Sequence, residues 1–329
     1  MTRTKSFLYN SMSTAILQIV TMLVGFITPR IMLQYYGSEI NGLVTSVNQF
    51  ISYFSLVEAG LSGAAIYALY KPLASNNHKA INGVVAATKK FYTQSGYIFV
   101  SLTLGLSVIY PVMVKSNTLS YSLIGLLVLI LGVNGALEFF TLAKYRVLLT
   151  ADQKTYVISI ATIIQIILST IIIAVLSVFQ VNIVFVRATA LSAILLRTLI
   201  LKIYVKSNYK FLNYREEPNI AALNKRWDAL YLQILGSTQT GVPVILATIF
   251  TSLKTVSIYS IYNMIIGGIN GILSIFISGL SASFGDVIAR EEKSTLQKSY
   301  EEFEFLYYSI ITIVYATSMV TIMPFIRIY

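Results

Sequence analysis

Four charged side chains lie inside segments of the sequence that are otherwise apolar, and their chemistry limits what the chain could do. Glu58 stands within FSLVEAGLSGAAIYALY, residues 54–70, and Glu138 follows another long apolar run. A carboxylate in such surroundings could take up a proton or a cation, or it could hydrogen-bond to a neighbouring helix. Arg30 and Arg187 could attract an anionic group such as a phosphate, or they could extend along apolar surface toward water.

The residue types that most catalysis requires are scarce. The chain has no cysteine, and His78 is its single histidine. Disulfides, thiol catalysis and thiolate or histidine metal clusters are therefore excluded, and we expect His78 to be an ordinary loop residue. The P-loop, HExxH and GxSxG patterns are all missing. We predict a protein that is not an enzyme, with no cofactor and no metal site, and we leave coupling to a proton or a sodium ion open.

The composition is that of a membrane protein. Hydrophobic residues make up 56% of the chain and charged residues 11%, with a mean hydropathy of +0.74. Soluble domains carry about 25% charged residues. About nine runs approach the roughly 20 residues that a helix needs to cross a bilayer. These runs are 8–35, 42–70, 91–114, 119–143, 156–178, 183–203, 229–251, 256–283 and 305–326. We predict an all-α polytopic membrane protein.

Basic residues concentrate on one side of these spans. Most of the 24 lysines and arginines fall at the N-terminus and in the connections near 71–90, 144–154, 202–226 and 290–298. This asymmetry predicts a multi-pass plasma-membrane protein with a cytoplasmic N-terminus. It also accounts for the net charge of +11 through attraction to anionic lipid headgroups, and it argues against nucleic acid as a partner.

Polar residues recur at steps of three or four along the first, second and eighth spans, which places them on one face of each helix. Such faces either mediate close helix packing or line a hydrated cavity, because lipid cannot satisfy amide and hydroxyl groups. With Asn134, which lies one turn before Glu138, the predicted cavity residues are Gln18, Thr21, Asn48, Ser52, Ser55, Ser62, Asn134, Asn263, Asn270 and Ser274. Glu58 lies about 20 Å of helix from Lys71, near the middle of the bilayer.

A short repeat indicates two halves with the same topology. The sequence Gly60-Leu61-Ser62 recurs as Gly279-Leu280-Ser281, and Ser55 matches Ser274 at the same offset. Parallel repeats of this kind occur in alternating-access transporters. We expect a six-helix lobe over residues 1–206, a cytoplasmic linker loop over 207–228, and a partial second lobe of three helices over 229–329.

Several stretches resemble Wzx-type polysaccharide flippases of the multidrug/oligosaccharidyl-lipid/polysaccharide exporter superfamily. They are VEAGLSGAAIYALYKPLA followed by NNHKAINGVV, YRVLLTADQKTYV, LKTVSIYSIYNMI and SGLSASFGDVIAREE, and the resemblance runs over essentially the whole chain. It implies a transporter of two MATE-like six-helix lobes in a bacterial membrane. It also implies a cargo, undecaprenyl-pyrophosphate-linked oligosaccharide units that move to the outer leaflet for capsular or other surface polysaccharide.

On this reading Arg30 and Arg187 attract the pyrophosphate headgroup, and Glu58 and Glu138 couple transport to an ion. The expected partners are the lipid-linked oligosaccharide, membrane lipids, and a polysaccharide polymerase with glycosyltransferases.

Two features depart from the resemblance. The chain ends at Tyr329, after the third span of the second lobe, so we expect a fragment or a truncated product. An acid expected early in the seventh span is replaced in the pair Thr240-Gly241. The alternatives left open are a drug/cation antiporter of the same superfamily, and a non-transporting assembly subunit or inactive fragment.

Overall fold

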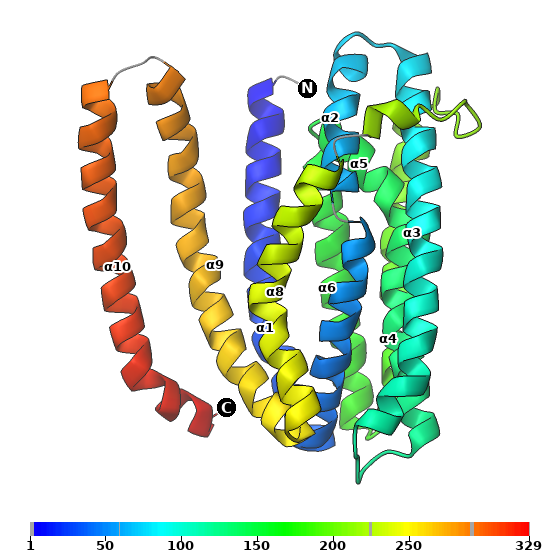
Figure 1. The fold of residues 1–329 in the computed structure, drawn as a ribbon, viewed down its shortest axis with the longest axis vertical. Coiled ribbons are helices and arrows are strands. Elements are labelled where there is room, and N and C mark those ends of the chain that lie inside the picture. The colour runs from blue at the N-terminus through cyan, green and yellow to red at the C-terminus, as the bar shows by residue number, and fades with distance from the viewer. Residues whose placement is uncertain (1–2, 59, 224–225, 290–292, 329) are drawn as a thin grey trace. The chain divides into compact units, whose positions relative to one another are not determined.

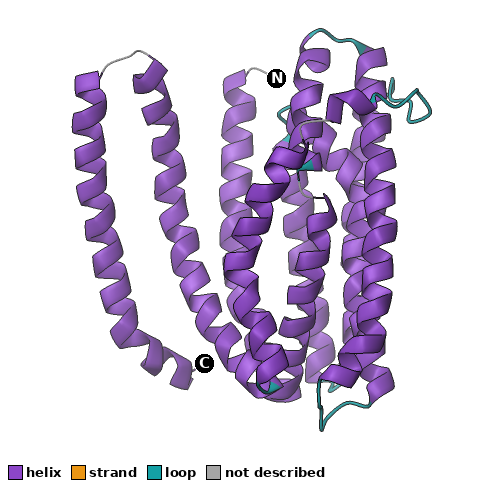
Figure 2. Cartoon of the chain, viewed as in Figure 1, coloured by secondary structure: helices purple, strands orange, loops and turns teal. Residues whose placement is uncertain are grey.

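The computed structural model describes residues 3–58, 60–223, 226–289 and 293–328, and every regular element within these ranges is a helix (Figure 2). In chain order the elements are α1 (Arg3–Phe54), a 3₁₀ turn η1 (Ser55–Glu58), α2 (Leu61–Ala74), α3 (His78–Met113), α4 (Tyr121–Leu137), a π-helical turn η2 (Glu138–Leu142), α5 (Ala143–Ala151), α6 (Thr155–Val178), α7 (Ile183–Asn208), a 3₁₀ turn η3 (Ile220–Leu223), α8 (Arg226–Phe250), α9 (Leu253–Ala289) and α10 (Lys293–Ile328).

The prediction of an all-α polytopic fold is confirmed. Each of the predicted spans lies on helix, and the described residues contain 6 helical segments long and apolar enough to cross a membrane. The first of these, Leu8–Ala74, contains two predicted spans. The chain forms two compact units, Met1–Ser257 and Ile258–Tyr329. The division into lobes at 206 and 229 stays a prediction.

Within the first unit, α1 folds back on itself at Gly37. The φ of +79° and ψ of 172° at this residue end one helix and start the next, in a region of backbone space that glycine adopts without steric cost. Figure 1 shows the two halves of α1 running in opposite directions. Asn10, in the first half, ties α1 to the start of α6: its Nδ2 donates to the carbonyl of Gln153 at 2.8 Å, and its Oδ1 accepts from the N–H of Tyr156 at 2.8 Å.

The second half of α1 packs closely on α8 and on the beginning of α9. A Cβ added to Gly42 would lie 1.8 Å from the carbonyl oxygen of Leu253, and one added to Gly241 would lie 2.3 Å from Nε2 of Gln49. Small residues permit this close approach of helices in membranes. The resemblance leads us to expect an acid where Gly241 stands, and a side chain at this position would displace the side chains of Gln49 and Tyr53.

Two of the spans are not regular helices along their full length. The second span breaks at η1 and at Gly60, whose left-handed backbone (φ 78°, ψ −23°) precedes α2. The fourth span passes from α4 through the π-helical turn η2 into α5. Our expectation that a connection follows residue 143 was wrong, because the helix continues to Ala151, and Arg146 lies within it. Irregular backbone at membrane depth is tolerated only where protein or enclosed water satisfies its polar groups.

In the second unit, α10 lies beside the part of α9 that belongs to that unit. The hydroxyl of Tyr315 donates to Oδ1 of Asn270 at 2.6 Å, and the hydroxyl of Tyr262 donates to Sδ of Met323 at 3.2 Å. One of the predicted cavity residues, Asn270, is thus hydrogen-bonded within this helix pair.

Candidate functional site

Glu58, the residue that first drew attention in the sequence, is ion-paired in the structure. Nη2 of Arg146 lies 2.9 Å from one carboxylate oxygen of Glu58 and 3.2 Å from the other. The side chain of Glu58 is 21% exposed and that of Arg146 is 31% exposed. Glu58 ends the 3₁₀ turn η1 and Arg146 lies on α5, so this pair joins the broken second span to the extension of the fourth.

The second acid within an apolar helical segment, Glu138, continues the same set of contacts. Its Oε1 accepts from Nη1 of Arg197 at 2.8 Å, and its Oε2 lies 4.0 Å from Nη1 of Arg146. Nη1 of Arg197 also donates to Oε1 of Gln165 at 3.0 Å. We call Glu58, Glu138, Arg146, Gln165 and Arg197 the ion-pair network. It connects η1, η2, α5, α6 and α7.

The charges of the ion-pair network cancel, because two carboxylates face two guanidinium groups. Placing one charge in an apolar medium is costly, and an oppositely charged partner offsets much of that cost. Breaking one pair leaves a charge without its partner and is strongly destabilising. A change in the charge of either acid would therefore alter the preferred positions of both arginines, and with them the helices that carry them.

A small cavity of about 60 Å³ lies at the centre of the ion-pair network. Its walls are formed by Ser55, Glu58, Gly135, Glu138, Phe139, Leu142, Ala143, Arg146 and Arg197. Since a water molecule needs about 10–15 Å³ of such space, the cavity has room for ordered water. Nε of Arg146 and Nε of Arg197 are buried and have no hydrogen-bond partner within the described parts of the chain. Water in the cavity would supply those partners.

Both acids of the ion-pair network lie at irregular turns. Glu58 is the last residue of a 3₁₀ turn, and Glu138 is the first residue of a π-helical turn. Single π-turns inside helices occur frequently at functional sites, and broken membrane helices form the binding sites of many transporters. The arrangement can respond chemically to a proton or a cation, because either would compete with Arg146 for Glu58.

The structure brings few of the predicted cavity residues to the ion-pair network. Ser55 lines the small cavity, and Ser62 is half-buried on α2. The predicted residues that are exposed on the chain are Gln18, Thr21, Asn48, Ser52, Asn134, Asn263 and Asn270. The side chain of Ser274 lies outside the described residues. The exposed amides and hydroxyls are not buried by packing within the chain, so their role as cavity lining stays a prediction.

Arg30 and Arg187 lie outside the ion-pair network as defined above. Arg30 is exposed on α1, and Arg187 is half-buried near the start of α7. Nε of Arg187 is buried with no hydrogen-bond partner among the residues that the structure describes. Their proposed role in binding a headgroup also stays a prediction.

Sequence reasoning missed three members of the ion-pair network: Arg146, Gln165 and Arg197. We had counted Arg146 with the basic residues of a connection, although it follows Glu138 by just over two helical turns. Arg197 falls inside the predicted span 183–203, and a cation at that depth is a signal for a buried acidic partner. His78 also differs from expectation, because it is the first residue of α3 and stacks on Phe211 with ring centroids 3.9 Å apart.

The fold can be compared with that of known proteins. No family model matches the sequence, and no curated protein matches it. A solved structure described as the inward-facing conformation of a multidrug resistance MATE family transporter of the MOP superfamily matches with a TM-score of 0.66. The match covers 93% of this chain and 73% of the other, at 14% sequence identity.

The chain has a MATE-like fold. At this low identity the likeness extends to the arrangement of helices, and the residues of the site must be interpreted from this chain alone. Within this fold, the ion-pair network is a group of charges in apolar helical segments whose partners the described residues define.

Proposed function

We propose that the chain is a membrane transporter that works by alternating access and moves undecaprenyl-pyrophosphate-linked oligosaccharides across the bacterial plasma membrane. The observation that carries the proposal is a charge-neutral ion-pair network built on two helix irregularities within a MATE-like fold. A purely structural bundle has little need for four charged groups at this depth, since apolar residues of similar volume are often at least as stabilising.

The proposed cargo is supported by the sequence resemblance and by the chemistry of exposed side chains. Amide and hydroxyl groups such as those of Gln18 and Asn48 suit the hydroxyl groups of sugars. Arg30 and Arg187 suit a pyrophosphate, because a guanidinium binds phosphate oxygens with two parallel hydrogen bonds. On this proposal the N-terminus is cytoplasmic, and a polymerase and glycosyltransferases act before and after the transport step.

The proposed coupling step centres on Glu58. A proton on its carboxylate, or a sodium ion beside it, would weaken its attraction to Arg146. Of the two acids of the network, Glu138 would then attract Arg146 more strongly, since its Oε2 is already 4.0 Å from Nη1 of Arg146. The helices that carry Glu58 and Arg146, η1 with α2 and α5, would be free to shift. Arg146 would thus exchange between a pair with Glu58 and a pair with Glu138. This exchange would bias the equilibrium between the inward-open and outward-open states.

The experiment is complementation of a strain that lacks its own oligosaccharide flippase, with surface polysaccharide as the readout. Wild-type chain should restore surface polysaccharide, and Glu58→Gln should lower it by at least tenfold at equal protein abundance. Glu217→Gln, a change of an exposed loop acid, is the matched control. Failure of the wild-type chain to restore polysaccharide, together with export of cationic drugs, would favour the drug/cation antiporter.

A second variant separates coupling from structure. The exchange Glu58→Arg with Arg146→Glu keeps an ion pair between η1 and α5 while moving the carboxylate to the other helix. If the exchanged protein is abundant but inactive, the position of the carboxylate matters for transport. If it is fully active with unchanged ion dependence, the pair serves stability alone and the coupling proposal is wrong.

A further inference from the structure

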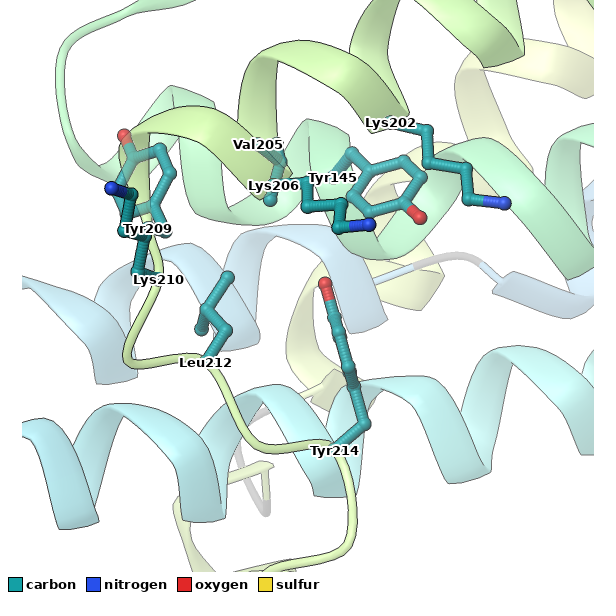
Figure 3. A pocket seen from close by; sticks show the side chains of 8 residues that line it. All are labelled: Tyr145, Lys202, Val205, Lys206, Tyr209, Lys210, Leu212 and Tyr214. Carbon is teal, nitrogen blue, oxygen red and sulfur yellow. The ribbon is translucent and has the colours of Figure 1, made fainter.

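A second cavity lies apart from the ion-pair network, at the end of α7. Its volume is about 410 Å³, and it is lined by Tyr145, Lys202, Val205, Lys206, Tyr209, Lys210, Leu212 and Tyr214. We call these residues the basic pocket. Figure 3 shows Tyr145 and Lys206 on one side and Tyr214 on the other, with their polar ends pointing toward the same space.

The cations of the basic pocket are not neutralised by carboxylates. None of the lining residues is acidic, and none of the ion pairs in the described ranges involves Lys202, Lys206 or Lys210. The carboxylate that contacts a lining residue is that of Asp152, which accepts from the hydroxyl of Tyr209 at 2.5 Å. Asp152 is already paired with Lys154 at 2.8 Å. The pocket therefore keeps an excess of positive charge.

Two further lysines add to this charge. Nζ of Lys144 lies 5.5 Å from the ring centroid of Tyr214, and Nζ of Lys89 lies 5.7 Å from the same centroid. Cations at these distances are attracted by the face of an aromatic ring. Tyr214 thus gathers two ammonium groups beside the cavity, and together with Lys202, Lys206 and Lys210 they form a concentration of positive charge.

The wall that carries Tyr214 is held in place before any ligand arrives. Nδ2 of Asn82 donates to the carbonyl of Phe211 at 3.1 Å, and its Oδ1 accepts from the N–H of Asn213 at 3.1 Å. The ring of His78 also stacks on Phe211. A fixed wall lowers the entropic cost of binding, which distinguishes this pocket from a flexible group of surface lysines.

The tyrosines of this wall are hydrogen-bond donors at neutral pH. Burial raises the pKa of Tyr214, and the neighbouring Tyr145 raises it further. Burial also raises the pKa of Tyr209, and its hydrogen bond to Asp152 adds to the rise. Neutral hydroxyl groups beside ammonium groups suit the oxygens of a phosphate, which accept from both.

We propose that the basic pocket binds the phosphate of an anionic phospholipid headgroup at the membrane boundary. Lys202 and Lys206 lie in the last two turns of α7, a helix long and apolar enough to cross a membrane, so the pocket opens where lipid headgroups lie. Basic pockets between membrane helices on the side with excess positive charge bind such headgroups. The proposal is independent of the identity of the transported molecule.

The test measures lipid binding to the purified chain by native mass spectrometry and by thermal stability in detergent. The probes are phosphatidylglycerol and, with the same acyl chains, zwitterionic phosphatidylcholine. Wild-type chain should retain phosphatidylglycerol in preference and be stabilised by it. Lys202→Gln with Lys206→Gln should weaken that binding by about thirtyfold, since each lysine near anionic lipid contributes about fivefold.

The matched control is Lys71→Gln with Lys79→Gln, which removes the same charge from exposed residues outside the pocket. The control should bind phosphatidylglycerol like the wild type. An equal loss of phosphatidylglycerol binding in the two double variants would overturn the proposal, because it would show that the lipid is attracted by basic surface residues in general and not by the pocket. If the pocket double variant does not fold, Lys210→Gln alone tests the same point on an exposed loop residue.

Soluble phosphates distinguish the source of the ligand. Inorganic phosphate and glycerol phosphate, added at millimolar concentration, should not displace phosphatidylglycerol from the wild-type chain. Displacement by either at that concentration would assign the pocket to a soluble phosphate compound and overturn the lipid proposal.

Discussion

The ion-pair network and the basic pocket hold cations in opposite electrostatic surroundings. In the network, Arg146 and Arg197 face the carboxylates of Glu58 and Glu138, and the charges cancel. In the pocket, Lys202 and the other lysines face a hollow without a carboxylate of its own. In the first arrangement, the carboxylates and the guanidinium groups offset one another's charge within the described residues. The second is incomplete and attracts an anion.

The difference follows from the partners that lie within reach of each cation. A lone charge at the middle of the bilayer costs about 2.5–3.5 kcal/mol on insertion scales, so charges there must find partners within the protein. At the headgroup level water and lipid phosphates are available, and a lysine can stay without a protein partner. The choice of residue agrees, since arginine suits paired carboxylates and lysine suits a hydrated surface.

The largest expected effect is that of Glu138→Gln, which removes a partner from both arginines of the network. Breaking a fully buried ion pair costs about 3–5 kcal/mol, and Glu138 is 40% exposed, so we expect the free energy of unfolding to fall by about 2–3 kcal/mol. Denaturant titration in detergent measures it. Glu217→Gln, on the exposed loop, should change it by less than about 0.5 kcal/mol. An equal loss in the two variants would contradict the existence of the network.

A double-mutant cycle at Glu58 and Arg146 sharpens the comparison. The pair is close, and Nη2 of Arg146 donates to both carboxylate oxygens, so we expect the cycle Glu58→Gln with Arg146→Gln to give a coupling free energy of about 1–2 kcal/mol. The same cycle applied to Lys202→Gln and Lys206→Gln should give a coupling of opposite sign, because like charges repel. Coupling near zero at Glu58 and Arg146 would mean that the pair does not interact in solution.

Salt should separate the two regions. The Debye length falls from about 10 Å at 0.1 M to about 3 Å at 1 M, and screening acts mainly on exposed charges. We expect the affinity of the basic pocket for phosphatidylglycerol to fall several-fold between 0.05 and 0.5 M sodium chloride. The coupling between Glu58 and Arg146 should change by less than about 0.5 kcal/mol. A similar dependence on salt for the lipid affinity and for the Glu58–Arg146 coupling would contradict the proposed difference between the two regions.

The smallest expected effect is that of Tyr214→Phe, which removes one hydroxyl and keeps the ring between Lys89 and Lys144. A hydrogen bond contributes about 0.5–1.5 kcal/mol net, so lipid affinity should fall about threefold. Native mass spectrometry measures the change, with Tyr121→Phe on an exposed residue far along the sequence as the control. A loss as large as that of the lysine variant would place the hydroxyl, rather than the cations, at the centre of binding.

Much of the fold could be predicted from the sequence, because apolar run length and the distribution of basic residues report directly on membrane crossing. The predicted spans fall on helices, and the intramembrane acids Glu58 and Glu138 were identified as exceptional. The breaks in the helices at Gly60 and at η2 were not predicted. A glycine two residues after Glu58 was a possible signal for the first of these breaks. Hydropathy is nearly the same for α-, 3₁₀- and π-helical turns, so it does not report their backbone geometry.

The ion-pair partners of the charged residues could not be predicted from the sequence either. Glu58 and Arg146 are separated by 88 positions, and Glu138 and Arg197 by 59. No local spacing relates them, and only the packing of η1, η2, α5 and α7 brings them together. The basic pocket combines the end of α7, a side chain of α5 and a loop fixed by Asn82 on α3, so its shape likewise depends on contacts between distant segments.

By itself, then, the sequence determined that this chain is a bundle of membrane-crossing helices. It identified Glu58 as a charge near the middle of a span and Glu138 as an acid close to the inner boundary. Both follow from the free energy of placing side chains in lipid, which depends on residue type and run length alone. The tertiary structure decided which arginine satisfies which acid and which lysines stay without a partner. Those outcomes depend on distances of about 3–4 Å between side-chain atoms on different elements, and only the packing of those elements against one another sets such distances.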